Sequence, residues 1–143
     1  EAQQLSVSLR SRDLDAAFSG DWTGQVLICD SLGEMAFAYA LADLVFVGAS
    51  LTPDGGHNIV EPLGQEKPVL MGPSIYGIAF PAEEAIAAGA LVLCQDGAAR
   101  AEAVIARVRE RARLAAHTRA ACGFGTQYKG AAQRTLSEIS PWL

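Results

Sequence analysis

Apolar residues along the chain follow two periods, one typical of strands and one typical of helices. Residues 5–10, LSVSLR, alternate apolar and polar side chains, as a half-buried strand does. Residues 25–30, QVLICD, form a short continuous apolar run, which is typical of a buried strand in a parallel sheet. Further apolar runs predict strands at residues 44–48, 68–72 and 91–96.

Helical spacing of apolar residues fills the intervals between these strands. It predicts helices at residues 33–42, 60–65 and 82–89, one long helix over roughly residues 98–116, and a last helix over residues 130–139. The segment SRDLDAAFSGDWTG is expected to be a loop or short helix joining the first two strands. Strands and helices that alternate through short turns make βαβ units, so we expect an α/β fold: a Rossmann-like parallel sheet with helices on both faces.

The length of the chain fits one domain, which we expect to span residues 1–143. A domain of this size buries roughly two-thirds of its unfolded surface, enough for a real core. No apolar run approaches the ~20 residues of a membrane span. The sequence begins at Glu1 without a methionine, and we expect it to be a fragment of a longer protein whose N-terminal part is absent.

The cysteines and histidines indicate no metal site. The three cysteines form no CxxC pair, and Cys29 and Cys94 lie within apolar runs, so we expect buried free thiols in a reducing cytoplasm. His57 and His117 are far apart in the sequence, and no zinc spacing occurs.

Charge is distributed unevenly along the chain. Residues 1–99 carry three basic residues against thirteen acidic ones, which argues against a nucleic-acid partner. Residues 100–143 carry eight basic residues against three acidic ones and include the stretch RVRERAR. That stretch is either a solvated helix face or a surface that contacts anionic phospholipid.

The carboxyl ends of parallel strands carry ligand loops, and unusual residues follow several of these ends. In DSLGE, Ser31 and Glu34 have the spacing of a capping box, and Asp30 is a candidate second cap. The alternative is a ligand site, because Gly33 would let another group approach the start of the helix closely.

The stretch DGGHNIVEP is the strongest candidate for a ligand loop. Gly55 and Gly56 permit positive φ and would leave backbone N–H groups uncovered at the start of a helix, which together form an anion site. Asn58 and Glu61 have the spacing of a helix cap, but Pro62 would then fall where its missing N–H costs a bond, so the helix is expected to start later.

If the helix starts later, several polar side chains of this loop are available to a ligand. Glu61 is then free to bind a hydroxyl pair such as that of a ribose, and His57 to donate to a phosphate or carboxylate. Ser50 is either a turn hydroxyl or a hydrogen-bond donor to a phosphate. Gly72–Pro73 ends a strand at the same edge of the sheet and is either an ordinary turn or part of the ligand site. Tyr76 and Phe80 are expected to pack in the core rather than on a base.

Three common motifs are absent from the sequence. It contains no GxxxxGK[ST] loop, no GxGxxG after the first strand and no GxSxG. The chain is therefore not expected to be a kinase, dehydrogenase or serine hydrolase.

The ordered set DSLGE, FVGASL, GGHNIVEP, KPVLMGP and GAAQRTL resembles the C-terminal half of the Kdo transferases. These enzymes move 3-deoxy-D-manno-octulosonic acid (Kdo) from CMP-Kdo to a lipid A precursor in lipopolysaccharide synthesis. The resemblance covers nearly the entire chain, and GGHN followed after two residues by EP is its most specific part. The chain departs from the family at Ala49, where a second glycine is common, and after Pro73, where the family often has Asn-Phe.

The resemblance implies the C-terminal half of an inverting GT-B glycosyltransferase that needs no metal or cofactor besides its donor, CMP-Kdo. The acceptor and the catalytic base would belong to the N-terminal domain, so this chain contains no candidate base and is predicted to be inactive in isolation. The parent protein would work at the cytoplasmic face of the bacterial inner membrane, with a membrane-surface contact.

Residue by residue, the resemblance implies two groups of donor contacts. Gly55, Gly56, His57 and Asn58 would cradle the CMP phosphate or the donor carboxylate, and Glu61 would hold the ribose hydroxyls. The nucleotide slot would be lined by Gly33, Glu34, Gly72 and Pro73.

Two alternatives remain open from the sequence. The chain could be the donor domain of a GT-B transferase that uses a UDP-sugar, or a non-catalytic Rossmann-like binding module. Binding of CMP, of UDP, or of neither would separate the three.

Overall fold

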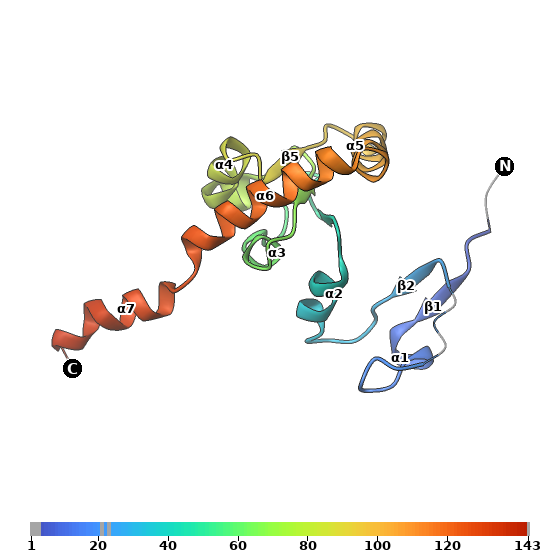
Figure 1. Ribbon diagram of the computed structural model, residues 1–143, viewed down its shortest axis with the longest axis horizontal. Coiled ribbons are helices and arrows are strands. Elements are labelled where there is room, and N and C mark those ends of the chain that lie inside the picture. Colours follow the sequence, from blue (N-terminus) through green and yellow to red (C-terminus); the bar gives the residue numbers. More distant parts are fainter. Residues whose placement is uncertain (1–3, 21, 23, 143) are drawn as a thin grey trace. The chain divides into compact units, whose positions relative to one another are not determined.

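The computed structural model describes residues 4–20, 22 and 24–142 and divides the chain into two compact units, Glu1–Ala38 and Tyr39–Leu143. Figure 1 shows the elements of both units along the chain. The single domain expected over residues 1–143 stays a prediction.

The first unit contains a small parallel sheet. Strand β1 (Val7–Leu9) pairs with β2 (Val26–Ile28), with Ser8 opposite Leu27. The short helix α1 (Arg10–Asp13) follows β1 directly, in agreement with the loop or short helix expected between the first two strands. Asp21 and Thr23 of that segment lie outside the described residues.

The second unit is built on a three-stranded parallel sheet with the order β3-β4-β5. Its strands are β3 (Val45–Val47), β4 (Val69–Met71) and β5 (Leu91–Leu93), and Val45, Val69 and Leu91 are in register. All three residues of the central strand are buried, which explains why its sequence is a continuous apolar run rather than an alternating one. All five predicted strands are present, each shorter than predicted.

One face of this sheet carries the main core of the second unit. The helices that contribute to it are α3 (Val60–Gly64), α4 (Ala79–Ala87, preceded by the 3-10 turn Tyr76–Ile78) and α6 (Arg111–Tyr128). The core contains Val47, Ile59, Leu63, Val69, Met71, Ala82, Ala85, Ala90, Leu91, Ala121 and Phe124. Burying a side chain as large as Ile59 or Met71 contributes about 1.5–3 kcal/mol, so this cluster is the principal source of stability in the unit.

The opposite face of the sheet is contacted by helix α5 (Gly97–Arg109). Side chains alternate between faces along a strand, so Phe46 points away from Val45 and Val47. The guanidinium of Arg100 in α5 lies over the Phe46 ring, 5.0 Å from its centroid. Helices therefore flank both faces of the sheet, and the α/β prediction is confirmed.

The single long helix predicted over residues 98–116 is wrong. Helix α5 ends at Arg109, Glu110 adopts non-helical dihedrals (φ −107°, ψ 85°), and α6 continues to Tyr128. Neither glycine nor proline marks this break. Tertiary packing explains it, since the turn allows α6 to bury Ala121 and Phe124 in the core while α5 stays on the other face.

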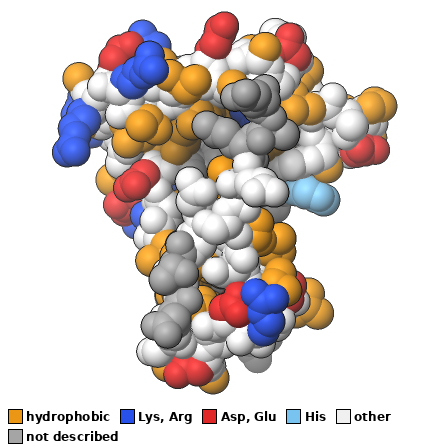
Figure 2. Space-filling view, turned by 90° about the vertical axis from the view of Figure 1, so that its right-hand side faces the viewer, with side chains coloured by type: hydrophobic (Ala, Val, Ile, Leu, Met, Phe, Trp, Pro, Cys, Tyr) orange, Lys and Arg blue, Asp and Glu red, His pale blue; other side chains and the backbone are white. Residues whose placement is uncertain are grey.

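The last predicted helix is present as α7 (Ala131–Ile139), followed by the 3-10 turn Ser140–Trp142. Figure 1 shows α7 extending beyond the helices that cover the sheet of the second unit. Its apolar side chains Leu136 and Ile139 are exposed. Figure 2 shows hydrophobic side chains lying between acidic and basic ones on one face of the molecule.

The cysteines differ from the sequence prediction at one position. All three are free, and Cys94 is buried as predicted, but Cys29 is exposed. It follows β2 in a two-stranded sheet, where few elements are available to cover an apolar run. None of the helices within residues 4–142 that the structure describes has the length and apolar character needed to cross a membrane.

Candidate functional site

The loops after β3 and β4 are joined by a buried hydroxyl. Ser50 is completely buried, and its Oγ donates to the carbonyl of Val47 at 2.6 Å and accepts from the N–H of Gly72 at 2.8 Å. A Cβ on Gly72 would lie 2.1 Å from the Ser50 carbonyl oxygen. Ser50 and Gly72 therefore hold two strand ends together, and the hydroxyl of Ser50 is not available to a phosphate.

The N–H groups of the two loop glycines are not free, which corrects the prediction of an uncovered pair of amides. Gly55 N–H donates to Ser74 Oγ at 2.9 Å, and Gly56 N–H donates to the carbonyl of Ala49 at 2.8 Å. A hydroxyl and a carbonyl of the protein thus occupy the positions where an anion was expected. Ser74 was missed at the sequence level because a serine after Gly-Pro is indistinguishable from an ordinary turn residue.

Glycine is nevertheless required at both positions. Gly55 and Gly56 have φ values of 84° and 75°, which side-chain-bearing residues rarely adopt. A Cβ on Gly56 would lie 1.9 Å from Met71 Cε, and one on Gly55 would lie 3.0 Å from the Tyr76 ring. Their role is to let the loop pass closely over the end of β4.

The helix after the loop begins where the sequence predicted. Helix α3 starts at Val60, so Asn58 lies in the loop. Pro62 is then the third helical residue, and its missing N–H costs no hydrogen bond, because the first four N–H groups of a helix have no helical partner. Asn58 Oδ1 accepts from Val60 N–H at 2.8 Å, and Asn58 Nδ2 donates to Glu61 Oε1 at 3.1 Å. Asn58 therefore closes the loop and positions the Glu61 carboxylate.

Three predicted site residues face solvent together at this loop. The side chains of His57, Asn58 and Glu61 are exposed, so Glu61 does not point into the core. Within the described part of the chain, the backbone N–H groups of His57, Asn58 and Glu61 have no hydrogen-bond partner. This short segment can therefore offer N–H donors, an imidazole and a carboxylate to a ligand.

Two aromatic residues are more exposed than the sequence predicted. Tyr76 and Phe80 were expected in the core, but each is 72% exposed. The Tyr76 ring lies against Gly55, and its hydroxyl donates to the carbonyl of Pro53 at 3.3 Å. Pro73, on the adjoining turn, is also exposed. The loop is thus bordered by an aromatic side chain that a ligand can reach.

Ala49 carries local backbone strain at the start of the same region. Its φ is 54°, in the left-handed region that favours glycine. The carbonyl of Ala49 accepts the Gly56 N–H, so the strained residue also helps to fix the loop.

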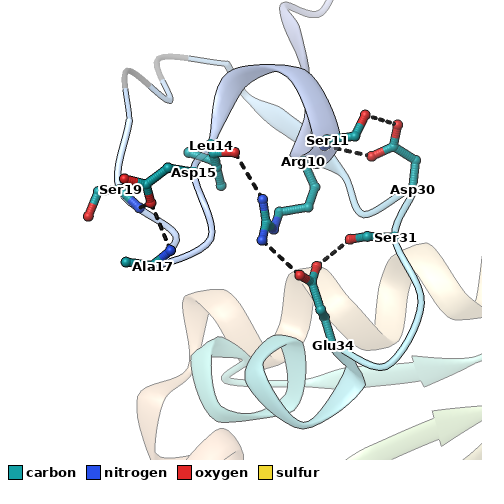
Figure 3. A network of polar contacts seen from close by, with 9 residues as sticks. All are labelled: Arg10, Ser11, Leu14, Asp15, Ala17, Ser19, Asp30, Ser31 and Glu34. Carbon is teal, nitrogen blue, oxygen red and sulfur yellow. Dashed lines mark hydrogen bonds and ion pairs between the residues drawn. The ribbon is translucent and has the colours of Figure 1, made fainter.

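Gly33 and Glu34 belong to the first unit, where Glu34 is part of a polar network (Figure 3). Arg10 is buried and lies at the centre of this network, with its guanidinium 4.1 Å from the centroid of the Phe18 ring. Its Nη1 donates to the Leu14 carbonyl at 3.0 Å, and its Nη2 donates to Glu34 Oε1 at 2.7 Å. Among the described residues, Arg10 Nε is a buried side-chain atom without a partner.

The capping-box interpretation of DSLGE is wrong. Helix α2 (Met35–Leu41) begins after Glu34, and the Ser31 hydroxyl donates to the Glu34 carboxylate rather than capping a backbone N–H. This hydrogen bond and the neighbouring Arg10 hold the pKa of the Glu34 carboxyl below its usual value. Asp30 is not a cap either, because it accepts two hydrogen bonds from Ser11, which lower the pKa of its carboxyl.

These contacts determine what Gly33 and Glu34 can offer. Both carboxylate oxygens of Glu34 already have protein partners, so its first role is to hold the network of the first unit together. Gly33 has a φ of 82° and open space around its Cα, which leaves it accessible to another group. Their assignment to the nucleotide slot stays a prediction.

The described residues contain no group of three His, Cys, Asp or Glu side chains that could hold a metal ion. The prediction that the reaction needs no metal or cofactor is not tested by this finding.

A solved structure resembles this fold closely. It is the crystal structure of the C-terminal CMP-Kdo binding domain of WaaA from Acinetobacter baumannii, with a TM-score of 0.72 and 30% identity over 82% of this chain and 59% of that chain. Parallel strands flanked by helices, together with this likeness, define the class: a Rossmann-like domain of the kind found in the C-terminal part of GT-B glycosyltransferases.

Sequence relatives narrow the class further. The chain is 37% identical over 118 residues to the 3-deoxy-D-manno-octulosonic acid transferase of Bordetella pertussis and 32% identical over 126 residues to that of Haemophilus influenzae. These matches cover 82% and 83% of the chain. The chain belongs to the 3-deoxy-D-manno-octulosonic acid transferase family.

The chain spans 28% of the length of each of these two relatives. A third relative, the transferase of Chlamydia trachomatis serovar D, is 44% identical over 59 residues, which is 41% of this chain. No family model matches the chain.

Proposed function

We propose that this chain is the donor-binding part of a glycosyltransferase that moves Kdo from CMP-Kdo to a lipid A precursor. The observation that carries the proposal is the 37% identity to a 3-deoxy-D-manno-octulosonic acid transferase over 82% of the chain. The solved neighbour, whose own description is a CMP-Kdo binding domain, supports the choice of donor.

The exposed loop of the second unit is the proposed site for the nucleotide. Glu61 accepts from Asn58 through Oε1, which leaves Oε2 to accept from the ribose hydroxyls. The N–H groups of His57 and Asn58, which have no partner among the described residues, donate with the His57 imidazole to the phosphate or to the Kdo carboxylate. Hydrogen bonds to charged groups of this kind contribute about 1.5–3 kcal/mol each, enough for micromolar to millimolar binding in combination.

Tyr76 is the proposed contact for the cytosine ring. It is an exposed aromatic side chain beside Gly55, held by its hydroxyl bond to Pro53. Base–aromatic stacking is worth about 1–3 kcal/mol in nucleic-acid-binding proteins, and the same physics applies to a nucleotide. Phe80 is exposed to the same extent and provides a matched comparison.

The rest of the reaction belongs to the longer protein of which this chain would be a part. We place the acceptor site and the catalytic base in its N-terminal part and the enzyme at the cytoplasmic face of the inner membrane. Departure of CMP with inversion at the anomeric carbon would be assisted by N–H donors around the developing negative charge. The isolated chain is therefore expected to bind donor without transferring Kdo, and measurable turnover by this chain alone would contradict that division.

Calorimetric titration of the chain with CMP and with UDP tests the proposal. We expect CMP to bind more tightly than UDP, and Tyr76→Ala to weaken CMP binding about tenfold while Phe80→Ala changes it little. Tighter binding of UDP would favour a UDP-sugar transferase. Binding of neither nucleotide would favour a non-catalytic module and would contradict the proposal.

A further inference from the structure

An open cavity of about 660 Å³ lies at the surface of the second unit, away from the loop described above, and most of the residues that line it are exposed. Its walls come from the two residues before β3, the end of α5 and the first half of α6. Asp43 and Leu44 come directly before β3, and Arg107 and Val108 belong to α5, so the cavity lies at the amino end of β3, beside α5. Small-molecule sites in proteins have volumes of roughly 300–1,000 Å³, and this cavity falls in that range.

The cavity is lined by three arginines and one acidic residue, Asp43. Arg107 is only 8% exposed, yet its Nε donates to His117 Nδ1 at 2.9 Å and its Nη1 donates to the Ala103 carbonyl at 3.0 Å, both neutral groups. Its Nη2 has no hydrogen-bond partner among the described residues. Burial lowers the pKa of the Arg107 guanidinium.

Neither this arginine nor the other two, Arg111 and Arg119, forms an ion pair with a carboxylate among the described residues. Arg107 is the buried one of the three, whereas Arg111 and Arg119 are exposed. A buried charge is normally compensated by an opposite charge, because its transfer out of water is costly when it has no partner. The cavity therefore has the charge that an anionic group would neutralise.

The cavity wall also contains apolar side chains, from Leu44, Val108, Leu114 and Ala115. On α6, Leu114 and Ala115 lie on one stripe with Arg111, Thr118 and Arg119 at helical spacing. Farther along α6, Ala121 and Phe124 are buried in the core. From α5, Val108 contributes a side chain that is 71% exposed.

We propose that this cavity is a second binding site, which takes an anionic amphiphile: a phosphate or carboxylate group at the arginines and an attached apolar body against Leu44, Val108 and Leu114. The guanidinium fork suits both kinds of anion, because it can donate two parallel hydrogen bonds. The apolar wall excludes a free inorganic anion as the best ligand, since such an ion would leave the wall hydrated.

The site is distinct from the proposed donor site. Ligand loops such as that of Glu61 follow the carboxyl ends of the strands, whereas Asp43 and Leu44 precede β3. The inference is therefore independent of the proposed function, and occupancy of the cavity is expected to leave CMP binding unchanged.

Titration of the chain with dodecyl phosphate, below its micelle concentration, tests the site by backbone amide shifts. We expect shifts confined to the ends of α5 and α6 that face the cavity. The double variant Arg111→Gln/Arg119→Gln should weaken binding about tenfold or more, and Val108→Ser should weaken it severalfold. Arg109→Gln changes an exposed arginine of α5 outside the cavity wall and should have an effect below about twofold.

Two further ligands separate the sources of binding. Inorganic phosphate should bind much more weakly than dodecyl phosphate, and dodecyl maltoside, which has no charge, should not produce the same shifts. The proposal is overturned if dodecyl phosphate does not bind or if the double arginine variant binds it as the unaltered chain does. It is equally overturned if inorganic phosphate or dodecyl maltoside binds as tightly as dodecyl phosphate.

Discussion

Asn58 and Glu61 are joined by a hydrogen bond of 3.1 Å from the amide Nδ2 to the carboxylate Oε1. The same Asn58 side chain accepts the N–H of Val60 at 2.8 Å, which folds the chain into the start of α3. One asparagine thus links the shape of the loop to the position of the carboxylate. The exposed carboxylate of Glu61 is held in place through Oε1, and Oε2 remains able to accept a hydrogen bond from a ligand.

Glu61→Gln should weaken CMP binding by about ten- to a hundredfold, because a hydrogen bond from a ribose hydroxyl to a charged acceptor is worth about 1.5–3 kcal/mol. Calorimetry measures the change directly. Glu83→Gln is the matched control, since Glu83 is an exposed glutamate of α4 that belongs to no predicted site. Equal effects of the two substitutions would remove Glu61 from the site.

Ala49→Gly should stabilise the protein by about 0.5–1 kcal/mol. The left-handed conformation of Ala49 costs about 1–2 kcal/mol, which exceeds the entropic cost of glycine in the unfolded chain. Chemical denaturation measures the difference. Ala88→Gly, at an exposed position with a right-handed φ of −75°, should instead be neutral or destabilising. A loss of stability in Ala49→Gly would show that the strain is absent.

Gly125→Ala should destabilise the protein by about 1–3 kcal/mol through overpacking. Helices α3 and α6 approach so closely that a Cβ on Gly125 would lie 2.2 Å from the Leu63 carbonyl oxygen. Gly123, two residues earlier in α6, has open space around its Cα, so Gly123→Ala should stabilise the helix by about 0.5–1 kcal/mol. Thermal or chemical unfolding of the pair compares the two; similar shifts in both variants would contradict the close contact.

Stability should decrease as the pH falls below the ordinary histidine pKa of about 6.5. Burial lowers the pKa of His117, so the unfolded chain binds this proton more readily than the folded chain. The contribution of His117 to the free energy of unfolding is therefore complete above about pH 6.5 and is lost as the pH falls, by at most about 1.4 kcal/mol per unit. Protonation would also place two donors, Arg107 Nε and His117 Nδ1, against each other.

Denaturation curves recorded between pH 7.5 and pH 5 test this dependence. The variant His117→Gln should lose it, whereas His57→Gln, which alters an exposed histidine, should retain it. A free energy of unfolding that stays constant over this range in the unaltered chain would refute the role of His117.

The order of the elements could be predicted from the sequence because local signals specify it. The continuous apolar run of β4 and the displacement of the α3 start by Pro62 are both consequences of short-range chemistry. The break at Glu110 could not be predicted in this way, because no local residue requires it and the packing of α6 on the core determines it.

Part of the candidate site could also be predicted from local signals in the sequence. The exposure of His57, Asn58 and Glu61 follows from the loop and the helix start, which are local. The partners of the Gly55 and Gly56 amides, Ser74 and Ala49, could not be foreseen, because Ser74 comes from the loop after the next strand and the Ala49 contact depends on a rare φ.

A crystal structure of the chain with bound CMP tests the central claim most directly. The claim is that the segment from Gly55 to Glu61 holds a cytidine nucleotide. We expect the ribose hydroxyls within hydrogen-bond distance of the Glu61 carboxylate and the phosphate at the N–H groups of His57 and Asn58. Density for CMP elsewhere on the chain, or a loop that stays empty at saturating CMP, would contradict the claim.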